Sequence, residues 1–207
     1  MKKPFINSFL IAFSLISFGI SSSSVYAVSL SIEPSTQTVY LRDSFDVNVD
    51  ISGLGDGSSL SLGAFDLDLM IFNDSHVSLN TVTFGNQLDF SAGLGSIALD
   101  TPPVDVIPGV SVVNIFEVSL EPTTVLNSMQ NASFTLATFN FTANSLGTSL
   151  FRLDNVVLSD EDGMQITPKD IIRGDVNVIP EPSTYALFGL GLVGLVIGYK
   201  RKKSHGA

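Results

Sequence analysis

Carboxylates are the side chains of this 207-residue sequence with the widest chemical scope, since it holds 20 Asp and Glu against two His and no Cys. Their densest cluster is Asp160-Glu161-Asp162-Gly163. Ca²⁺ prefers oxygen ligands, and a turn could place the carboxylates of Asp160 and Asp162 around one ion. The alternating ligands and the terminal glutamate of an EF-hand loop are missing, whereas a solvated hairpin turn with glycine at its left-handed position fits these residues. We predict the turn, and calcium is the only cofactor that we consider for it.

A second candidate for chemistry is His76, which directly follows Asp74 and Ser75. Adjacent residues on one turn do not make a catalytic triad, so we interpret His76 as a polar loop residue. The other histidine, His205, lies near the C-terminus. Residues 28–178 contain one histidine and no cysteine, so thiol catalysis and the usual His/Cys zinc sites are excluded there.

Two aspartates acting as a pair, such as Asp66 and Asp68, could still cleave a glycosidic bond. A sugar-cleaving groove normally offers aromatic platforms, but the sequence has no Trp, and Tyr40 is the only Tyr between residues 28 and 178. We therefore predict that the protein is not an enzyme. A secreted carboxylate-dependent glycoside hydrolase and a calcium-dependent adhesin remain as alternatives.

Residues 28–178 are predicted to form one strongly acidic domain. They hold 19 carboxylates and four basic residues, Arg42, Arg152, Lys169 and Arg173. Such a surface repels nucleic acid and anionic lipid and attracts cations. Because the absence of Cys excludes disulfides, the hydrophobic core must stabilise the fold alone, for which about 150 residues suffice.

Apolar and polar residues alternate along this region. From Phe45 to Ile51 every second residue is apolar and those between are Asp or Asn, and Phe65–Ile71 has the same period. The predicted strands are Val28–Ile32, Val39–Leu41, Phe45–Ile51, Phe65–Ile71, Val77–Phe84, Val110–Leu120, Phe134–Phe141, Leu150–Leu153, Val156–Leu158 and Val176–Val178.

Glycine and proline clusters separate these strands, and no stretch has a sustained helical period. Eight to ten short strands with one apolar face each predict an all-β fold, in which two antiparallel sheets pack face to face as a β-sandwich. The aspartates between the apolar residues are expected on the solvent faces; they are Asp46, Asp50, Asp66 and Asp68.

The N-terminus is typical of a secretory signal peptide. A basic start, Met1-Lys2-Lys3, precedes an apolar stretch from Phe5 to Ile20, and Val25-Tyr26-Ala27 offers small residues where a signal peptidase reads them. We predict a signal peptide over residues 1–27 that is cut after Ala27.

The C-terminus is typical of a membrane helix with a cytoplasmic stop. An uncharged apolar run from Tyr185 to Tyr199 is followed directly by four basic residues, Lys200, Arg201, Lys202 and Lys203. We predict a short transmembrane helix over residues 183–199, because Pro180 and Pro182 favour extended chain before it. The two ends agree on topology, since both place residues 28–178 outside the inner membrane.

This tail resembles the PEP-CTERM sorting signal of Gram-negative bacteria: Pro180, Glu181 and Pro182 match its tripeptide, and Arg201 fits its basic end. The resemblance implies that residues 179–207 are a sorting signal processed by exosortase. It also implies transient anchoring in the inner membrane, then delivery to the cell surface or the exopolysaccharide matrix.

The region before the tail is similar to cohesin-type domains. The similarity is carried by Arg42–Val49, Gly63–Leu69, Leu158–Ile166 and Gly174–Val178. Cohesins are jelly-roll sandwiches that bind dockerin modules, and their relatives include carbohydrate-binding modules. The segment from Gly85 to Pro108 departs from the pattern, since it reads as long and irregular. Together the two resemblances imply a surface or matrix protein that binds polysaccharide or a protein partner.

Overall fold

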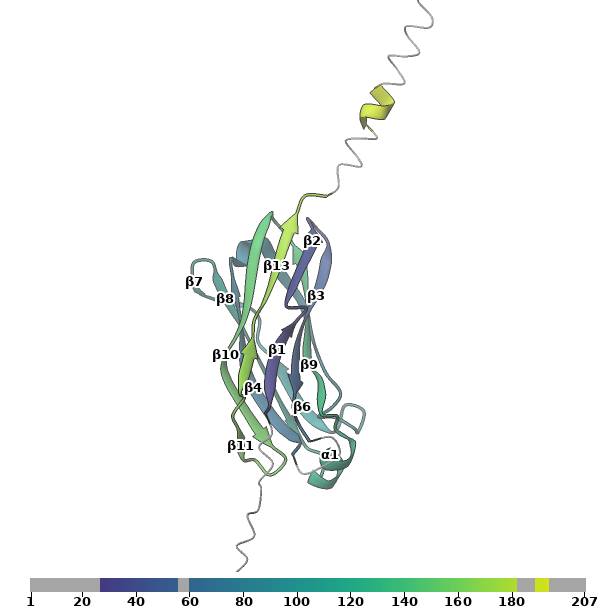
Figure 1. The fold of residues 1–207 in the computed structure, drawn as a ribbon, viewed down its shortest axis with the longest axis vertical. Helices are drawn as coiled ribbons and strands as arrows, with labels where there is room; N and C mark the ends of the chain where they lie inside the picture. The colour runs from purple at the N-terminus through teal and green to yellow at the C-terminus, as the bar shows by residue number, and fades with distance from the viewer. Residues whose placement is uncertain (1–26, 56–59, 182–188, 194–207) are drawn as a thin grey trace, which may run out of the picture.

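Two β-sheets pack face to face in the computed structural model of the chain, which describes residues 27–55, 60–181 and 189–193 (Figure 1). The small sheet has the order β12 (Asp170–Ile172), β1 (Ser29–Glu33), β3 (Ser44–Ser52), β9 (Ser133–Ala143) and β5 (Val77–Phe84). The large sheet has the order β2 (Thr36–Tyr40), β13 (Gly174–Ile179), β10 (Gly147–Asp160), β4 (Leu62–Phe72), β8 (Val110–Ser119) and β6 (Ser96–Asp100). Two short strands extend the large sheet: β11 (Gln165–Ile166) pairs with β10 and β7 (Val104–Ile107) with β8.

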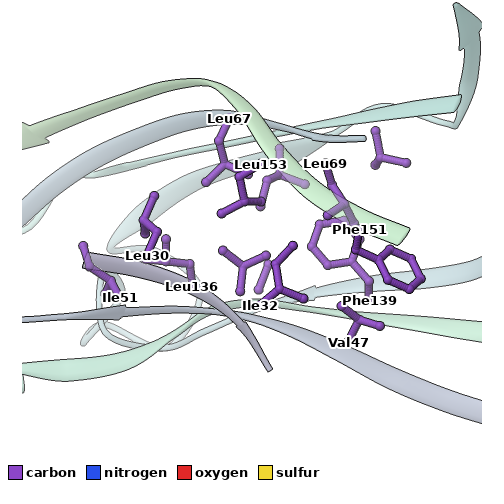
Figure 2. Packing of buried hydrophobic residues seen from close by; sticks show 14 of the residues in the cluster. Leu30, Ile32, Val47, Ile51, Leu67, Leu69, Leu136, Phe139, Phe151 and Leu153 are labelled. Atoms are coloured by element: carbon purple, nitrogen blue, oxygen red, sulfur yellow. The ribbon is translucent and has the colours of Figure 1, made fainter. Parts of the chain in front are cut away.

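The alternating pattern places one face of each long strand in the core. Leu67 and Leu69 of β4 and Leu153 of β10 point from the large sheet towards the small one, where Ile32 and Ile51 meet them (Figure 2). Four fully buried phenylalanines fill the same layer: Phe65, Phe139, Phe141 and Phe151. Burial of such side chains contributes about 1.5–3 kcal/mol each, which makes this layer the main source of stability in a chain without disulfides.

The prediction of a two-sheet all-β sandwich is confirmed, but the prediction that both sheets are antiparallel is wrong. Strand β1 pairs in parallel with β12, and β2 pairs in parallel with β13. The reason is that residues 29–40 and 170–179 run side by side in the same direction and change sheets together. Hydrophobic alternation has the same period in both kinds of pairing, so it did not reveal this.

Most predicted strands are present, with two differences. Leu150–Leu153 and Val156–Leu158 form one continuous strand, β10, whose pairing with β4 shifts register between Asp154 and Val157. The segment Gly85–Pro108, interpreted as irregular, contains β6 and β7. Apart from Ser96, the residues of these two strands are exposed, so they show no burial pattern that alternation could reveal.

A short helix, α1 (Thr123–Met129), was also not predicted, because Leu126 is its single buried residue. Directly after it, Gln130 is only 3% exposed. The Gln130 side chain accepts a hydrogen bond from the Leu62 amide at 2.5 Å and donates to the carbonyls of Leu62 and Gln87, each at 3.0 Å. This glutamine thereby attaches the end of the helix to the start of β4.

Candidate functional site

The expected sorting segment begins where the last strand ends. Ile179 is the final residue of β13, and its carbonyl accepts a hydrogen bond from the Leu41 amide at 2.9 Å. Pro180 and Glu181 follow immediately and are exposed. Figure 1 shows the chain leaving the end of the sandwich after β13. Two residues of the expected sorting tripeptide are therefore presented outside the sandwich, directly after a strand anchored in its sheet.

Other terminal predictions concern residues that are mostly outside the described ranges. Pro182 and the basic cluster of residues 200–203 are not described, and of the expected span 183–199 the structure describes residues 189–193, which are helical. In the parts of the chain that the structure describes, no helix has the length and apolarity needed to cross a membrane. Ala27 is described and exposed, but cleavage after it stays a prediction.

The acidic cluster after β10 forms the predicted hairpin turn. Asp160 Oδ1 accepts hydrogen bonds from the amides of Asp162 at 3.0 Å and Met164 at 2.7 Å, and Gly163 has a φ of +80°. Within residues 27–55, 60–181 and 189–193, no group of three or more Asp, Glu, His or Cys is arranged to hold a metal ion. Calcium binding by Asp160 and Asp162, the alternative to a solvated turn, stays untested.

His76 and Asp74, which are close in sequence, make hydrogen bonds with different residues. His76 Nδ1 lies 2.8 Å from Ser145 Oγ, whereas Asp74 Oδ2 accepts a hydrogen bond from Ser111 Oγ at 3.0 Å. The His76 ring also covers Gly147. This arrangement fits the interpretation of His76 as a loop residue that joins the start of β5 to the loop before β10.

Over β3, β9 and β5 the solvent face of the small sheet is polar and internally hydrogen-bonded, whereas the edge strand β12 exposes Ile171 and Ile172. Asn140 on β9 donates to Asp46 on β3 at 2.7 Å and accepts from Asn80 on β5 at 2.8 Å. Further along the same pair of strands, Thr135 Oγ1 donates to Asp50 at 2.6 Å. The large exposed hydrophobic residues of the described chain include none from β3, β9 or β5.

The solvent face of the large sheet also has a polar network at its centre. Asn114 Nδ2 on β8 donates to Asp66 Oδ1 at 2.7 Å and to Asp68 Oδ1 at 2.9 Å on the neighbouring strand β4. Asn155 Nδ2 of the β10 bulge donates to Asp68 Oδ2 at 2.6 Å. Both aspartates lie on the solvent side, as predicted, and they share one amide donor.

Apolar side chains surround this network, in contrast to the small sheet. In the row beside it, Leu99 on β6 pairs with Phe116 on β8, which pairs with Asp66 on β4, which pairs with Val157 on β10. Directly opposed residues share a face of the sheet, so this row is apolar except for its aspartate. Further apolar residues of the same face come from neighbouring rows: Ile97, Val118, Val112, Met70, Phe72 and Leu150.

We call the solvent side of β10, β4, β8 and β6 the large-sheet face. Leu99 is 62% exposed there, Val157 50% and Ile97 49%. Scattered apolar residues are normal on protein surfaces, but on this face several lie in the rows on both sides of a hydrogen-bonded polar centre, an arrangement that suits an interaction site. This face was not predicted, because the alternation within each strand does not show the register that aligns Leu99 on β6 with Val157 on β10.

Comparisons with known proteins agree with both resemblances. A family model described as the PEP-CTERM protein-sorting motif matches residues 178–202. The sandwich is similar to the cohesin CaCohA2 from Clostridium acetobutylicum, at 21% identity and a TM-score of 0.54, over 74% of this chain and 91% of that one. A comparison with curated proteins finds no match.

Two further solved structures show the same fold. One is a chain of a type I cohesin–dockerin complex from Clostridium thermocellum, at 11% identity and a TM-score of 0.55, with coverage of 74% of this chain and 99% of that one. The other is a non-cellulosomal cohesin from the archaeon Archaeoglobus fulgidus, at 14% identity and a TM-score of 0.50, with coverage of 77% and 96%. The described sandwich therefore has a cohesin-like fold, and at these identities the likeness concerns the fold alone.

Proposed function

We propose that the protein is exported and sorted through its C-terminal segment, and that its sandwich is a non-enzymatic module that binds a protein partner through the large-sheet face. In this proposal residues 1–27 are a signal peptide, 28–178 the binding domain and 179–207 the sorting signal. Residues 183–199 anchor the chain in the inner membrane until exosortase processes it near Pro180–Pro182. The product then resides at the surface or in the matrix of a Gram-negative bacterium.

The matched sorting motif supports the export part of this proposal, together with the exposure of Pro180 and Glu181 next to the last strand. A processing enzyme needs an extended, accessible substrate, and the prolines favour extended chain. The strongly acidic domain fits an aqueous destination away from nucleic acid and anionic lipid.

The observation that carries the binding part is the difference between the two solvent faces. The small sheet shows hydrogen-bonded Asn, Asp and Thr side chains, whereas the large-sheet face exposes apolar residues in adjoining rows. Apolar residues around a few fixed polar groups are typical of protein–protein interfaces. The likeness to a chain from a cohesin–dockerin complex supports a protein as the partner of that fold.

The alternatives fit these observations less well. For polysaccharide binding, the polar face of the small sheet is the obvious surface, but its side chains already bond to one another. For glycoside cleavage, Asp66 and Asp68 would have to act as a pair, but both accept from the same Asn114 amide and are held in a network that joins neighbouring strands.

The test is to capture partners from the native extracellular fraction with the wild-type protein and with Leu99→Asp and Val157→Asp, and then to measure the affinity of the captured protein. We expect each charged substitution to weaken that affinity at least tenfold. The matched control is Leu94→Asp, which puts the same charge on a residue that is 81% exposed outside the four strands of the face. Binding that all variants retain, or release of reducing sugar from exopolysaccharide, would refute the proposal.

A further inference from the structure

A pocket of about 650 Å³ opens at the edge of the sandwich, between the end of β5 and the strands β6 and β8. Phe84 and Ala98 supply apolar wall, and Asp89 and Glu117 supply carboxylates. Strand β6 is at the edge of the large sheet: the side chain of Ile97 lies on the large-sheet face, whereas Ser96 and Ala98 lie on the other side of β6, together with Glu117. A partner that covers the face and wraps around the β6 edge therefore reaches the mouth of the pocket.

The two carboxylates of the pocket are satisfied to different degrees. Asp89 accepts three backbone hydrogen bonds from the loop that closes the pocket: from Ser91, Gly93 and Gly95. Its charge is therefore occupied in ordering that loop. Glu117 has no comparable set of donors, since its Oε1 accepts one hydrogen bond, from Ser96 Oγ at 2.7 Å.

Glu117 is nevertheless deeply buried, at 2% exposure, on the inward-facing side of β8. No hydrogen bond among the described residues reaches its Oε2. In the described part of the chain, no fully buried side-chain oxygen lacks a partner, so Oε2 must touch solvent, and the solvent beside Glu117 is that of the pocket. A buried carboxylate thus directs one free oxygen into an open pocket.

The pocket also lacks a positive charge of its own. None of the ten residues that line it is basic, and Arg152 and Arg173 line a different pocket. A buried carboxylate without a cationic partner is costly, and a ligand that brings a cation removes that cost. The apolar walls suit the aliphatic stem of a long basic side chain, which keeps its charge at the tip.

We propose that this pocket receives a lysine or arginine side chain of the protein partner, with its cationic group on Glu117 and its stem against Phe84 and Ala98. The proposal rests on the proposed partner at the large-sheet face and specifies the chemistry by which that partner is recognised. It also explains why an acidic side chain occupies an inward position of β8.

The acid–base behaviour of Glu117 fits this role. The pKa of its carboxyl group is raised from 4.5 to about 6: burial is the main cause, the hydrogen bond from Ser96 opposes it, and the negative charge of Asp89 adds to it. The carboxylate is therefore ionised at neutral pH. A bound cation favours the ionised form, so occupancy of the pocket must lower this pKa again.

The test uses the full chain in non-ionic detergent, with ¹³C-labelled methyl groups and Glu carboxyl carbons followed by NMR. The probe is N-acetyl-lysine methylamide, and the comparison is the norleucine analogue, which has the same stem without the charge. We expect the lysine probe to shift the Ala98 methyl signal saturably and to lower the pKa of Glu117, and the norleucine analogue to do neither.

Glu117→Gln should weaken the lysine probe at least tenfold. Asp100→Asn, which removes an equal charge from an exposed residue of the same strand as Ile97, should change it less than twofold. Equal binding of norleucine, equal effects of the two variants, or a stronger response to CaCl₂ than to lysine would overturn the proposal. If the probe fails while Leu99→Asp still abolishes partner capture, the pocket is refuted and the proposed function stands.

Discussion

The carboxylate of Glu117 accepts a hydrogen bond from the hydroxyl of Ser96 across the β8–β6 pair, at 2.7 Å. Glu117 makes this hydrogen bond inside the sandwich, where its side chain is only 2% exposed. A single hydroxyl donor does not offset the loss of hydration of a carboxylate, which is why burial dominates and its pKa rises to about 6.

The raised pKa of Glu117 predicts a pH-dependent stability. Below about pH 4.5 the carboxyl group of Glu117 is protonated in both the folded and the unfolded chain, so it does not lower the free energy of unfolding. Between about pH 4.5 and pH 6 the unfolded chain ionises first, so the free energy of unfolding falls. Above about pH 6 both forms are ionised and the loss is complete. The free energy of unfolding of Glu117→Gln relative to wild type should increase by about 1–2 kcal/mol between pH 4 and pH 7. Urea unfolding at both pH values measures it. A difference that does not change with pH would contradict the prediction.

Gly147 predicts a strongly destabilising substitution. Its φ is +138°, and a Cβ at this position would lie 2.5 Å from Nε2 of His76. Gly147→Ala should lower the free energy of unfolding by about 2–4 kcal/mol, since backbone strain and the steric clash add. Gly109→Ala is the matched control, because Gly109 has a φ of +82° with nothing within 4 Å, and it should cost only about 1 kcal/mol.

The contribution of the clash can be isolated with a second substitution. In a His76→Ala background the ring is absent, so Gly147→Ala should cost only the backbone strain at φ +138°, and therefore less than in the wild type. Thermal or urea unfolding of the wild type, the two single variants and the double variant gives the interaction free energy between positions 76 and 147 directly. If the cost at position 147 were the same with and without the His76 ring, the contact would not be the cause.

The hydrogen bonds of Asn114 predict that the polar network on the large-sheet face contributes to the free energy of unfolding. Asn114→Ala leaves Asp66 and Asp68 side by side without their shared donor, so the free energy of unfolding should fall by about 1–2 kcal/mol. Asn80→Ala on the small sheet is the control, because Asn80 donates to the neutral side chains of Asn140 and Thr142, and it should cost less, about 0.5–1 kcal/mol. Urea unfolding at low salt measures both, and the reverse order would contradict the prediction.

A strand could be predicted from the sequence where its apolar and polar residues alternate. Alternation located β3 and β4 and placed Asp66 and Asp68 on a solvent face, because one side of each strand is buried along its length. It missed β6, in which Leu99 and its neighbours are exposed. It also missed the parallel pairs, since period two is common to both directions.

The candidate pocket was missed for a different reason. Glu117 follows Val113 and Ile115 at intervals of two, so its inward position in β8 was visible in the predicted strand Val110–Leu120. What the sequence did not show is the segment that closes the pocket, because Asp89 and Ser96 lie in a stretch without periodicity. The sorting tripeptide, by contrast, was predictable because it is a contiguous motif that needs no tertiary contact to be recognised.

The last prediction concerns the sorting segment. Glu181→Ala or Pro182→Ala should leave full-length protein in the inner membrane and reduce the mature form outside the cell at least tenfold. Glu181 is exposed and lies beyond the end of β13, so its substitution should not change the stability of the sandwich. The control is Asn177→Ala, an exposed residue of β13 just before the matched range 178–202, which should be processed normally. Fractionation and immunoblotting measure both forms, and urea unfolding confirms that each variant is folded. Mature-sized protein outside cells that carry a folded Glu181→Ala variant would show that the tripeptide is not the processing signal.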